Sequence, residues 1–439
     1  MFMQTLDGTI VITALPAMAR SLHADPLRMH AVISAYLLAM ALLIPASGWL
    51  AERYGARHIY LGALAAFTGG SLLCAAADSV PLLVAARVVQ GMGGALLLPV
   101  GRLAVLRAVP RAQLLQAMSF IAIPALVGPL LGPTLGGWLV ETVSWHWIFL
   151  INVPIGAACA LATLALMPRT PGRRRLPFDF AGYLMLGGAM AALAIAMELL
   201  SERRPPVASL LVWAATGAAA LACYARHAAR SRHPLFSPAL LAQRSMSVAL
   251  GGNLLCRLGS ACMPVLAPLL MQLCMGYTPS QAGLMMLPVA LAGIAVKRIA
   301  APLIGRAGYR RVLLTNTALL GLTMGSVALL RPGQPWWLHA LPLACFGAVN
   351  SLQLTAMNTL ALKDLTRRQA SSGTSLLSMV QMLAMGLGVA CAGALLAGAA
   401  RVFGDATLNA FRGTFVAMGL LTLMSSAVFL RLPRQRPDH

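Results

Sequence analysis

Long apolar runs separated by short polar stretches make up nearly the whole chain. A membrane helix needs about 20 apolar residues to cross the hydrocarbon layer, so we count each such run as one span. The pattern predicts fourteen spans, at residues 1–19, 29–51, 59–77, 81–104, 112–138, 147–167, 180–200, 207–227, 247–272, 279–297, 311–330, 337–360, 373–398 and 413–430. We therefore predict an all-α integral membrane protein with no large soluble domain.

Basic residues are distributed unequally among the connections between these spans. If the N-terminus lies inside, the cytoplasmic connections and tail hold 23 Lys and Arg residues, Lys297 among them, whereas the outer connections hold seven. Membrane proteins retain positive residues on the cytoplasmic side. The distribution therefore predicts that both termini are cytoplasmic.

The composition excludes several classes of protein. Of the 439 residues, 59% are hydrophobic and 10% are charged, whereas a soluble domain carries about 25% charged residues. We assign the net charge of +22 to topology and lipid contact, and expect no nucleic acid as partner. Neither Lys297 nor Lys363 follows a glycine, so an ATP-binding P-loop is absent. The eight cysteines form no C-x-x-C pair. We expect no enzymatic activity, no cofactor and no metal site.

An internal repeat supports a division into two halves. Five residues of the connection after the second span recur 253 positions later, with Leu50, Arg53, Gly55, Arg57 and Leu61 matching Leu303, Arg306, Gly308, Arg310 and Leu314. Two parallel halves of a transporter predict such a repeat. We predict a six-helix bundle at residues 1–167, two linker helices at 168–246 and a second six-helix bundle at 247–439.

Asp7 is the only acidic residue well inside a predicted span, and Arg87 lies inside the fourth span. Ionisable groups are expensive in a membrane and are functional candidates by default. Counting 1.5 Å per residue places Asp7 about 18 Å and Arg87 about 9 Å below the outer surface, so the two side chains can pair. Asp7 is a candidate proton carrier. A static structural ion pair is the alternative.

Polar residues on the later spans are candidates for a central substrate cavity. Asn253, Arg257 and Ser260 lie at i, i+4 and i+7 on one face of the ninth span. Weaker polar sets follow in the twelfth and thirteenth spans, where substrate contacts and interhelical hydrogen bonds are both compatible with the pattern. The cavity candidates are Asn253, Arg257, Ser260, Gln90, Asn350, Gln353 and Gln381, while Arg102, near a helix end, is expected to snorkel and receives no role.

Residues 128–137 combine glycine and proline inside an apolar run. Gly128, Gly132 and Gly136 share one helix face and permit close packing, while Pro129 and Pro133 bend a helix. With Gly137 adjacent, the stretch predicts a bent, tightly packed membrane helix. A loop between two spans is the alternative.

The end of the second span carries a carboxylate among basic residues. Such groups can hydrogen-bond neighbouring helix ends and lock one conformation. The alternative, which fits the sequence equally well, is that the basic residues only anchor the end of the span on the cytoplasmic side. The residues of this candidate latch are Gly48, Glu52, Arg53, Gly55 and Arg57.

Five segments, in this order and spacing, resemble the major facilitator superfamily. They are LDGTIVITALP at residues 6–16, GWLAERYGAR at 48–57, RVVQGMGG at 87–94, GPLLGPTLGG at 128–137 and WHWIFLINVPIG at 145–156. The resemblance is to the fourteen-span drug/proton antiporter branch of the EmrB/QacA type, and within it to the MdtD-like group. It implies two six-helix bundles plus two extra helices, and export of amphipathic or cationic drug-like compounds in exchange for protons across a bacterial inner membrane.

The resemblance also implies roles for particular residues. Asp7 would be the coupling carboxylate, Arg87 its basic partner, residues 48–57 a conformational latch and residues 128–137 the antiporter motif. The chain departs from the family pattern at Ile12, usually Asn, at Glu52, usually Asp, and at Ala56, usually basic. Only six residues precede Asp7, which favours a start at an internal methionine and a shortened first span.

Two other functions stay open from the sequence. One is export of an endogenous metabolite such as a sugar, an amino acid or a siderophore. The other is a non-transporting role in an efflux complex, with a periplasmic adaptor and an outer-membrane channel as partners. For the leading function we expect a monomer whose partners are a small-molecule substrate, protons and the lipid bilayer.

Overall fold

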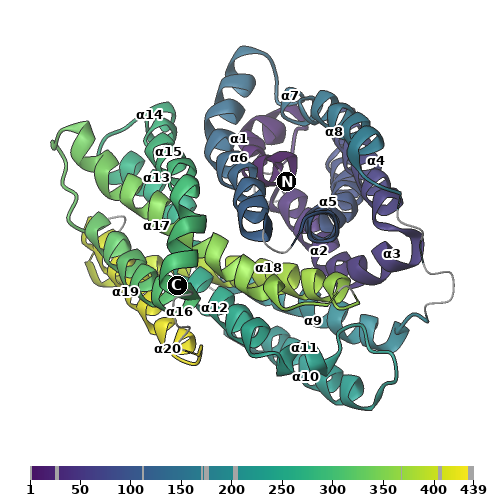
Figure 1. The fold of residues 1–439 in the computed structure, drawn as a ribbon. Coiled ribbons are helices and arrows are strands. Elements are labelled where there is room, and N and C mark those ends of the chain that lie inside the picture. Colours follow the sequence, from purple (N-terminus) through teal and green to yellow (C-terminus); the bar gives the residue numbers. More distant parts are fainter. Residues whose placement is uncertain are drawn as a thin grey trace.

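The structure is a computed structural model that describes residues 2–24, 29–110, 113–169, 172, 177–200, 206–366, 368–403 and 408–433. All regular secondary structure in these ranges is helical. Figure 1 shows the helices before residue 170 grouped on one side and those after residue 244 on the other, with α18 running between the groups. The predicted all-α class is confirmed.

The first six predicted spans coincide with helices. A sharp turn at Gly55, where φ is 87°, separates two of these helices and requires a residue without a Cβ atom. The helices are α1 (Phe2–Ser21), α2 (His30–Leu43), η2 (Ile44–Ala46), α3 (Ser47–Tyr54), α4 (Ala56–Ala75), α5 (Val80–Ala108), α6 (Leu114–Thr142), α7 (Trp147–Leu150) and α8 (Asn152–Leu166).

The remaining helices carry the other predicted spans. They are α9 (Phe180–Leu200), α10 (Val207–Arg230), α11 (Pro238–Ala242), α12 (Arg244–Ser260), α13 (Met263–Cys274), α14 (Pro279–Leu284), α15 (Leu287–Ala295), α16 (Lys297–Val327), α17 (Trp336–Lys363), α18 (Ala370–Phe403), α19 (Leu408–Met424) and α20 (Ser426–Phe429). Within α16, Gly308 has a φ of 75°, close to that of Gly55. The two glycines are 253 residues apart, so the sequence repeat has a counterpart in the backbone.

The number of membrane-spanning helices depends on how bent helices are counted. Ten helices in the described residues are long and apolar enough to cross a membrane, and two bent pairs raise the number to twelve. One bent pair is α1, with 61° between its halves, and the other joins residues 281–295 to α16 at 47°. The fourteen predicted spans are reached when α6 is added and the second pair is divided at Gly308.

One predicted boundary is wrong. Lys297 does not lie in a connection, because it begins α16 and its side chain is buried against α17. Its ammonium group donates hydrogen bonds to the carbonyl of Ser351, at 3.1 Å, and to the hydroxyl of Thr355. The apolar run resumes after Arg298, so the helix continues beyond the charged residues.

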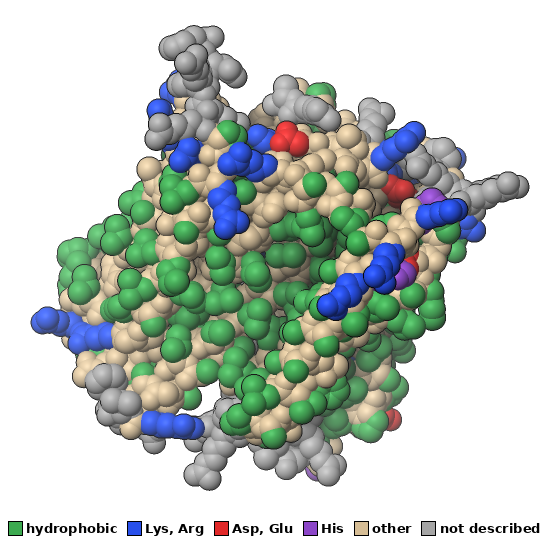
Figure 2. All heavy atoms as spheres, turned by 90° about the horizontal axis from the view of Figure 1, so that it is seen from below, with side chains coloured by type: hydrophobic (Ala, Val, Ile, Leu, Met, Phe, Trp, Pro, Cys, Tyr) green, Lys and Arg blue, Asp and Glu red, His purple; other side chains and the backbone are tan. Residues whose placement is uncertain are grey.

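The surface is that of a membrane protein. Large hydrophobic side chains such as Leu161, Leu166 and Leu329 are 68%, 82% and 73% exposed. In Figure 2, hydrophobic side chains cover much of the face shown, and Lys and Arg side chains lie mostly toward its upper and outer parts. Exposed apolar surface of this extent is stable in lipid but not in water. We call the end of the bundle that carries Arg53, Arg107, Arg310 and Lys363 the basic end.

Candidate proton and substrate site

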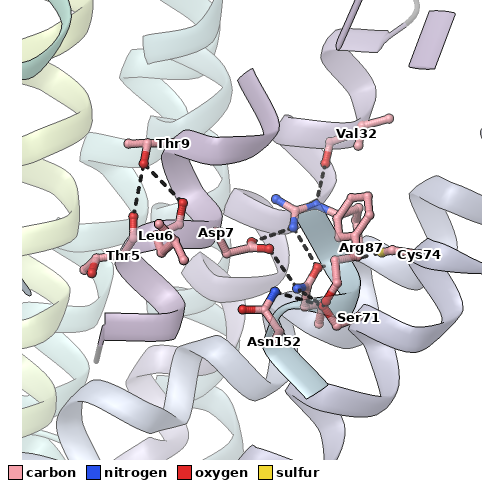
Figure 3. Close-up of polar contacts among 11 residues, drawn as sticks. Thr5, Leu6, Asp7, Thr9, Val32, Ser71, Cys74, Arg87 and Asn152 are labelled. Atoms are coloured by element: carbon pink, nitrogen blue, oxygen red, sulfur yellow. Dashed lines mark hydrogen bonds and ion pairs between the residues drawn. The ribbon is translucent and has the colours of Figure 1, made fainter. Parts of the chain in front are cut away.

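A buried ion pair joins α1 to α5. The Arg87 Nη1 atom lies 2.6 Å from Asp7 Oδ2, and both side chains are almost fully buried. Figure 3 shows the carboxylate directed at the guanidinium. Gln90 Nε2 donates to the other carboxylate oxygen at 2.9 Å. Asp7 is the only fully buried acidic residue in the described part of the chain, so its charge depends on these two partners.

Arg87 has anchors besides Asp7. Its Nε donates to the carbonyl of Val32 at 3.3 Å, and its Nη1 donates to Gln90 Oε1 at 2.6 Å. The guanidinium also lies 4.2 Å from the centre of the Tyr36 ring, in a cation–π arrangement. The arginine is therefore held by α2 and α5 through contacts that do not involve Asp7.

A chain of polar side chains extends from Gln90. Gln90 Nε2 donates to Ser71 Oγ at 3.1 Å, Asn152 Nδ2 donates to the same oxygen at 3.0 Å, and Ser71 Oγ donates to the carbonyl of Phe149 at 3.0 Å. Sequence reasoning gave no role to Ser71 or Asn152. Both are isolated polar residues in apolar helices, which is the signal that could have identified them.

The glycine face of α6 packs against the part of α1 that carries Asp7. A Cβ atom on Gly132 would overlap Thr9 Oγ1 and lie 3.1 Å from the backbone nitrogen of Ile10. Gly128 and Gly136 meet Thr5 and Thr13 in the same way, so three glycines face three threonines, each set at a spacing of four residues. The stretch is continuous helix, which confirms the predicted helix and makes the loop alternative wrong. The predicted bend stays a prediction. The side chains of Pro129 and Pro133 lie outside the described residues.

Glycines also bring α2 and α4 close to the Arg87 segment of α5. A Cβ atom on Gly91 would lie 2.6 Å from the carbonyl oxygen of Tyr36, and one on Gly93 would lie 2.6 Å from that of Ala63. The glycines after Arg87 therefore let neighbouring backbones approach the ion pair and exclude larger groups from it.

A second polar cluster connects the two groups of helices. Gln381 Nε2 donates to Asn253 Oδ1 at 3.1 Å and to Asn358 Oδ1 at 2.6 Å, and Arg257 Nε donates to Asn253 Oδ1 at 3.3 Å. Arg102 of α5 donates to Gln381 Oε1 at 2.8 Å. We call these five residues the amide cluster. It contains two arginines, and neither forms an ion pair among the described residues.

Arg102 corrects an expectation. It does not snorkel to a surface, because it is 6% exposed and also lies 3.5 Å from Ser378 Oγ on α18. Sequence reasoning missed it because a position near a helix end fits both orientations.

The other cavity candidates lie apart from this cluster. Gln353 accepts from Asn316 and donates to Thr317, both at 2.8 Å, and so joins α17 to α16. Gln90 belongs to the Asp7 site, Ser260 is buried on α12, and Asn350 has a buried side-chain oxygen with no hydrogen-bond partner in the described structure. Of the seven candidates, only Asn253, Arg257 and Gln381 are brought together.

The latch candidates lie at the basic end, where α3 meets α18. Glu52 accepts a hydrogen bond from Ser371 Oγ at 2.5 Å and lies 3.7 Å from the guanidinium of Arg107. A Cβ atom on Gly48 would lie 2.8 Å from the carbonyl oxygen of Ser371, so only glycine allows this approach. The hydroxyl oxygens of Ser47 and Ser375 are 2.7 Å apart.

In the described part of the chain, the contacts of the basic latch members are with the end of the first group of helices and with the connection that follows it. Arg57 donates to the carbonyls of Leu164 and Met167, at 2.7 and 3.1 Å, at the end of α8. The carbonyl of Arg53 abuts Gly172. Gly55 provides the turn between α3 and α4, as described above.

Comparison with known proteins agrees with this architecture. The family model described as Major Facilitator Superfamily matches residues 1–389 and 249–439. Two relatives are each named "Putative multidrug resistance protein MdtD". The one from Klebsiella pneumoniae (strain 342) is 46% identical to this chain, and the one from Cronobacter sakazakii (strain ATCC BAA-894) is 47% identical. Each match covers 98% of this chain and 92% of the relative.

Two solved structures show the same fold. The human organic anion transporter MFSD10 (TETRAN) has a TM-score of 0.67 at 16% identity and covers 98% of this chain and 97% of its own. The proton:xylose symporter XylE has a TM-score of 0.64 at 12% identity, with 97% and 92% covered. The resemblance found in the sequence is confirmed: the chain belongs to the Major Facilitator Superfamily of membrane transporters.

Proposed function

We propose that this transporter exports amphipathic drug-like compounds in exchange for protons. The observation that carries the proposal is the buried Asp7–Arg87 pair, in which a carboxylate on one helix meets an arginine fixed by two others. A proton taken up by Asp7 cancels the charge that holds α1 to Arg87, whereas release of the proton restores it. The names of the MdtD relatives support drug-like compounds as the cargo.

The two groups of helices supply the moving parts of this mechanism. We assign residues 1–167 and 247–439 to two bundles that rock against each other, with 168–246 as linker helices. Substrate would enter between them and meet Asn253, Arg257 and Gln381. The two arginines of the amide cluster have no counter-charge there and repel a positive group. We therefore expect a cationic substrate to bind with its charged end toward Asp7.

Transport in proteoliposomes with an imposed pH gradient tests the function. We expect accumulation of an amphipathic dye such as ethidium that requires the gradient and stops when a protonophore dissipates it. A metabolite that is accumulated in place of every dye tested would favour the alternative of a metabolite exporter. Absence of gradient-driven transport for both groups of compounds would contradict the proposal.

We further propose that the contact between α3 and α18 opens and closes in each cycle. Cysteines at Ser47 and Ser375 should form a disulfide, because the hydroxyl oxygens they replace are 2.7 Å apart. Oxidation of this double variant should stop transport, and a reductant should restore it. The Ser47→Cys variant alone, oxidised in the same background without native cysteines, is the control. Undiminished transport by the cross-linked protein would show that this interface does not open.

The charge distribution supports an orientation with the basic end in the cytoplasm of a bacterial cell and the protein in the inner membrane. Arg311 and Arg331 are both exposed and lie near opposite ends of the second half of α16. An impermeant maleimide should label Arg331→Cys in intact cells, and should label Arg311→Cys only after the membrane is permeabilised. The reverse pattern would invert the orientation.

A further inference from the structure

We propose that a pocket at the basic end binds a phosphate-bearing anion, either the headgroup of an anionic phospholipid or a free phosphate compound. This site is separate from the Asp7 site and from the amide cluster, and the inference does not depend on the transported substrate. The pocket lies where the connection before α12, the turn within α16, the end of α17 and the segment after α20 meet.

The pocket has a surplus of positive charge. Its volume is about 310 Å³, and its lining includes Arg244, Arg310 and Lys363 but only one acidic residue, Asp364. Lys363 Nζ is 4.0 Å from Asp364 Oδ2, which is too far for a hydrogen bond. One carboxylate at this distance leaves most of the positive charge uncompensated.

The first half of the chain offers a comparison for this surplus. In the first half, Glu52 lies 3.7 Å from Arg107, near the end of α5. The residue 253 positions after Glu52 is Gly305, so the second half has no carboxylate at the equivalent position. Lys363 occupies the end of α17 much as Arg107 occupies the end of α5. The second half therefore has a cation at a comparable helix end but no carboxylate at the position equivalent to Glu52.

The other lining residues fit a phosphate group attached to a larger molecule. Phosphate oxygens accept charge-assisted hydrogen bonds from guanidinium and ammonium groups, and Arg310 and Lys363 offer one of each. Tyr309 lies under the Lys363 ammonium, 5.0 Å from ring centre to Nζ, which restricts where that side chain can point. Leu360 and Leu432 provide an apolar wall for carbon atoms next to the phosphate. Basic pockets at the cytoplasmic ends of membrane helices are typical sites for anionic headgroups.

Native mass spectrometry of the delipidated full-length protein tests the proposal. Phosphatidylglycerol should bind in preference to phosphatidylcholine, and Arg310→Gln combined with Lys363→Gln should weaken its binding about tenfold or more. Arg311→Gln is the matched control, because Arg311 is exposed on the same helix and does not line the pocket. Equal binding of both lipids, or equal affinity of the double variant and the control, would overturn the proposal.

Inorganic phosphate separates the two sources of the anion. If millimolar phosphate binds the lipid-free protein and displaces phosphatidylglycerol, a free phosphate compound is the ligand. If phosphatidylglycerol binds and phosphate does not displace it, the ligand is the lipid. Either result supports a phosphate-binding pocket only if the variant that combines Arg310→Gln with Lys363→Gln loses the binding.

A variant that adds the missing carboxylate guards against misfolding of the double variant. Nothing lies within 4 Å of a Cβ atom built on Gly305, so a longer side chain is tolerated there. Gly305→Glu adds a carboxylate four residues before the lining residue Tyr309, at the position equivalent to Glu52, and its negative charge should weaken anion binding, whereas the uncharged Gly305→Gln should not. Unchanged binding in Gly305→Glu would contradict the charge-surplus argument and with it the proposal.

Discussion

Replacing Asp7 by asparagine is expected to abolish all gradient-driven accumulation of substrate while the protein remains folded in the membrane. Asparagine has the same shape and can still accept a hydrogen bond from Gln90 Nε2, which lies 2.9 Å from the carboxylate. It cannot gain or lose a proton at neutral pH. Gradient-driven uptake of a dye by proteoliposomes is the measurement, and exchange of dye without a gradient should persist in the variant.

This experiment needs a control variant and a measurement of stability. Asp78→Asn is the matched control, because Asp78 is exposed and lies between α4 and α5. Loss of one partner of a buried ion pair costs about 3–5 kcal/mol, so the Asp7→Asn protein should also melt at a lower temperature. Arg87 keeps its contacts with Val32 and Gln90, which limits that loss. Accumulation that still follows the pH gradient in a folded Asp7→Asn protein would remove Asp7 from the coupling mechanism.

The second large effect is expected from Gly132→Val in α6. The first carbon of the valine side chain would lie 2.9 Å from the Cβ atom of Thr9 and 3.1 Å from the backbone nitrogen of Ile10. A backbone cannot yield as a flexible side chain does, so α1 must move away from α6 and carry Asp7 with it. We expect transport to fall to background and the free energy of unfolding to fall by about 1–3 kcal/mol.

Gly137→Val in the same helix is the control for this variant. A Cβ atom on Gly137 has nothing within 4 Å, so the same change of residue type is made without a steric conflict. Transport measured at equal amounts of folded protein should therefore be normal in Gly137→Val. If Gly132→Val transports as well as Gly137→Val, the glycine face has no role beyond ordinary helix packing.

The sequence was sufficient to predict features that are determined by neighbouring residues in the chain or by the depth of a residue in the membrane. Asp7 and Arg87 could be expected to meet because each stands alone in an apolar run at a depth that helix length determines. The repeat that joins the Gly55 and Gly308 segments is visible in the sequence, whereas the turn at each glycine is known only from its positive φ. Residues 128–137 could be recognised as helix because a charge-free run of this length has no stable alternative in lipid.

Features that depend on the rotation and register of helices could not be predicted. A polar residue on a span can face any neighbour, so Gln353 and Gln381, on adjacent predicted spans, contact different partners. The sequence predicts an exposed Arg102 and Lys297 because both lie near predicted boundaries, and only the packing of α18 and α17 shows that they are buried. The match between the glycines of α6 and the threonines of α1 requires the axial register of the two helices, which hydropathy does not contain.

That match restricts how α1 can move. Thr5, Thr9 and Thr13 each occupy the space left by one glycine, and the spacing is four residues on both helices. At 1.5 Å per residue, adjacent positions of equal fit are about 6 Å apart along the helix axis, and every intermediate position sets a threonine side chain against a helix turn. Continuous sliding of α1 along α6 is therefore blocked. The carboxylate of Asp7 either travels together with α6 as one body or changes its depth in the membrane in a single step of about 6 Å.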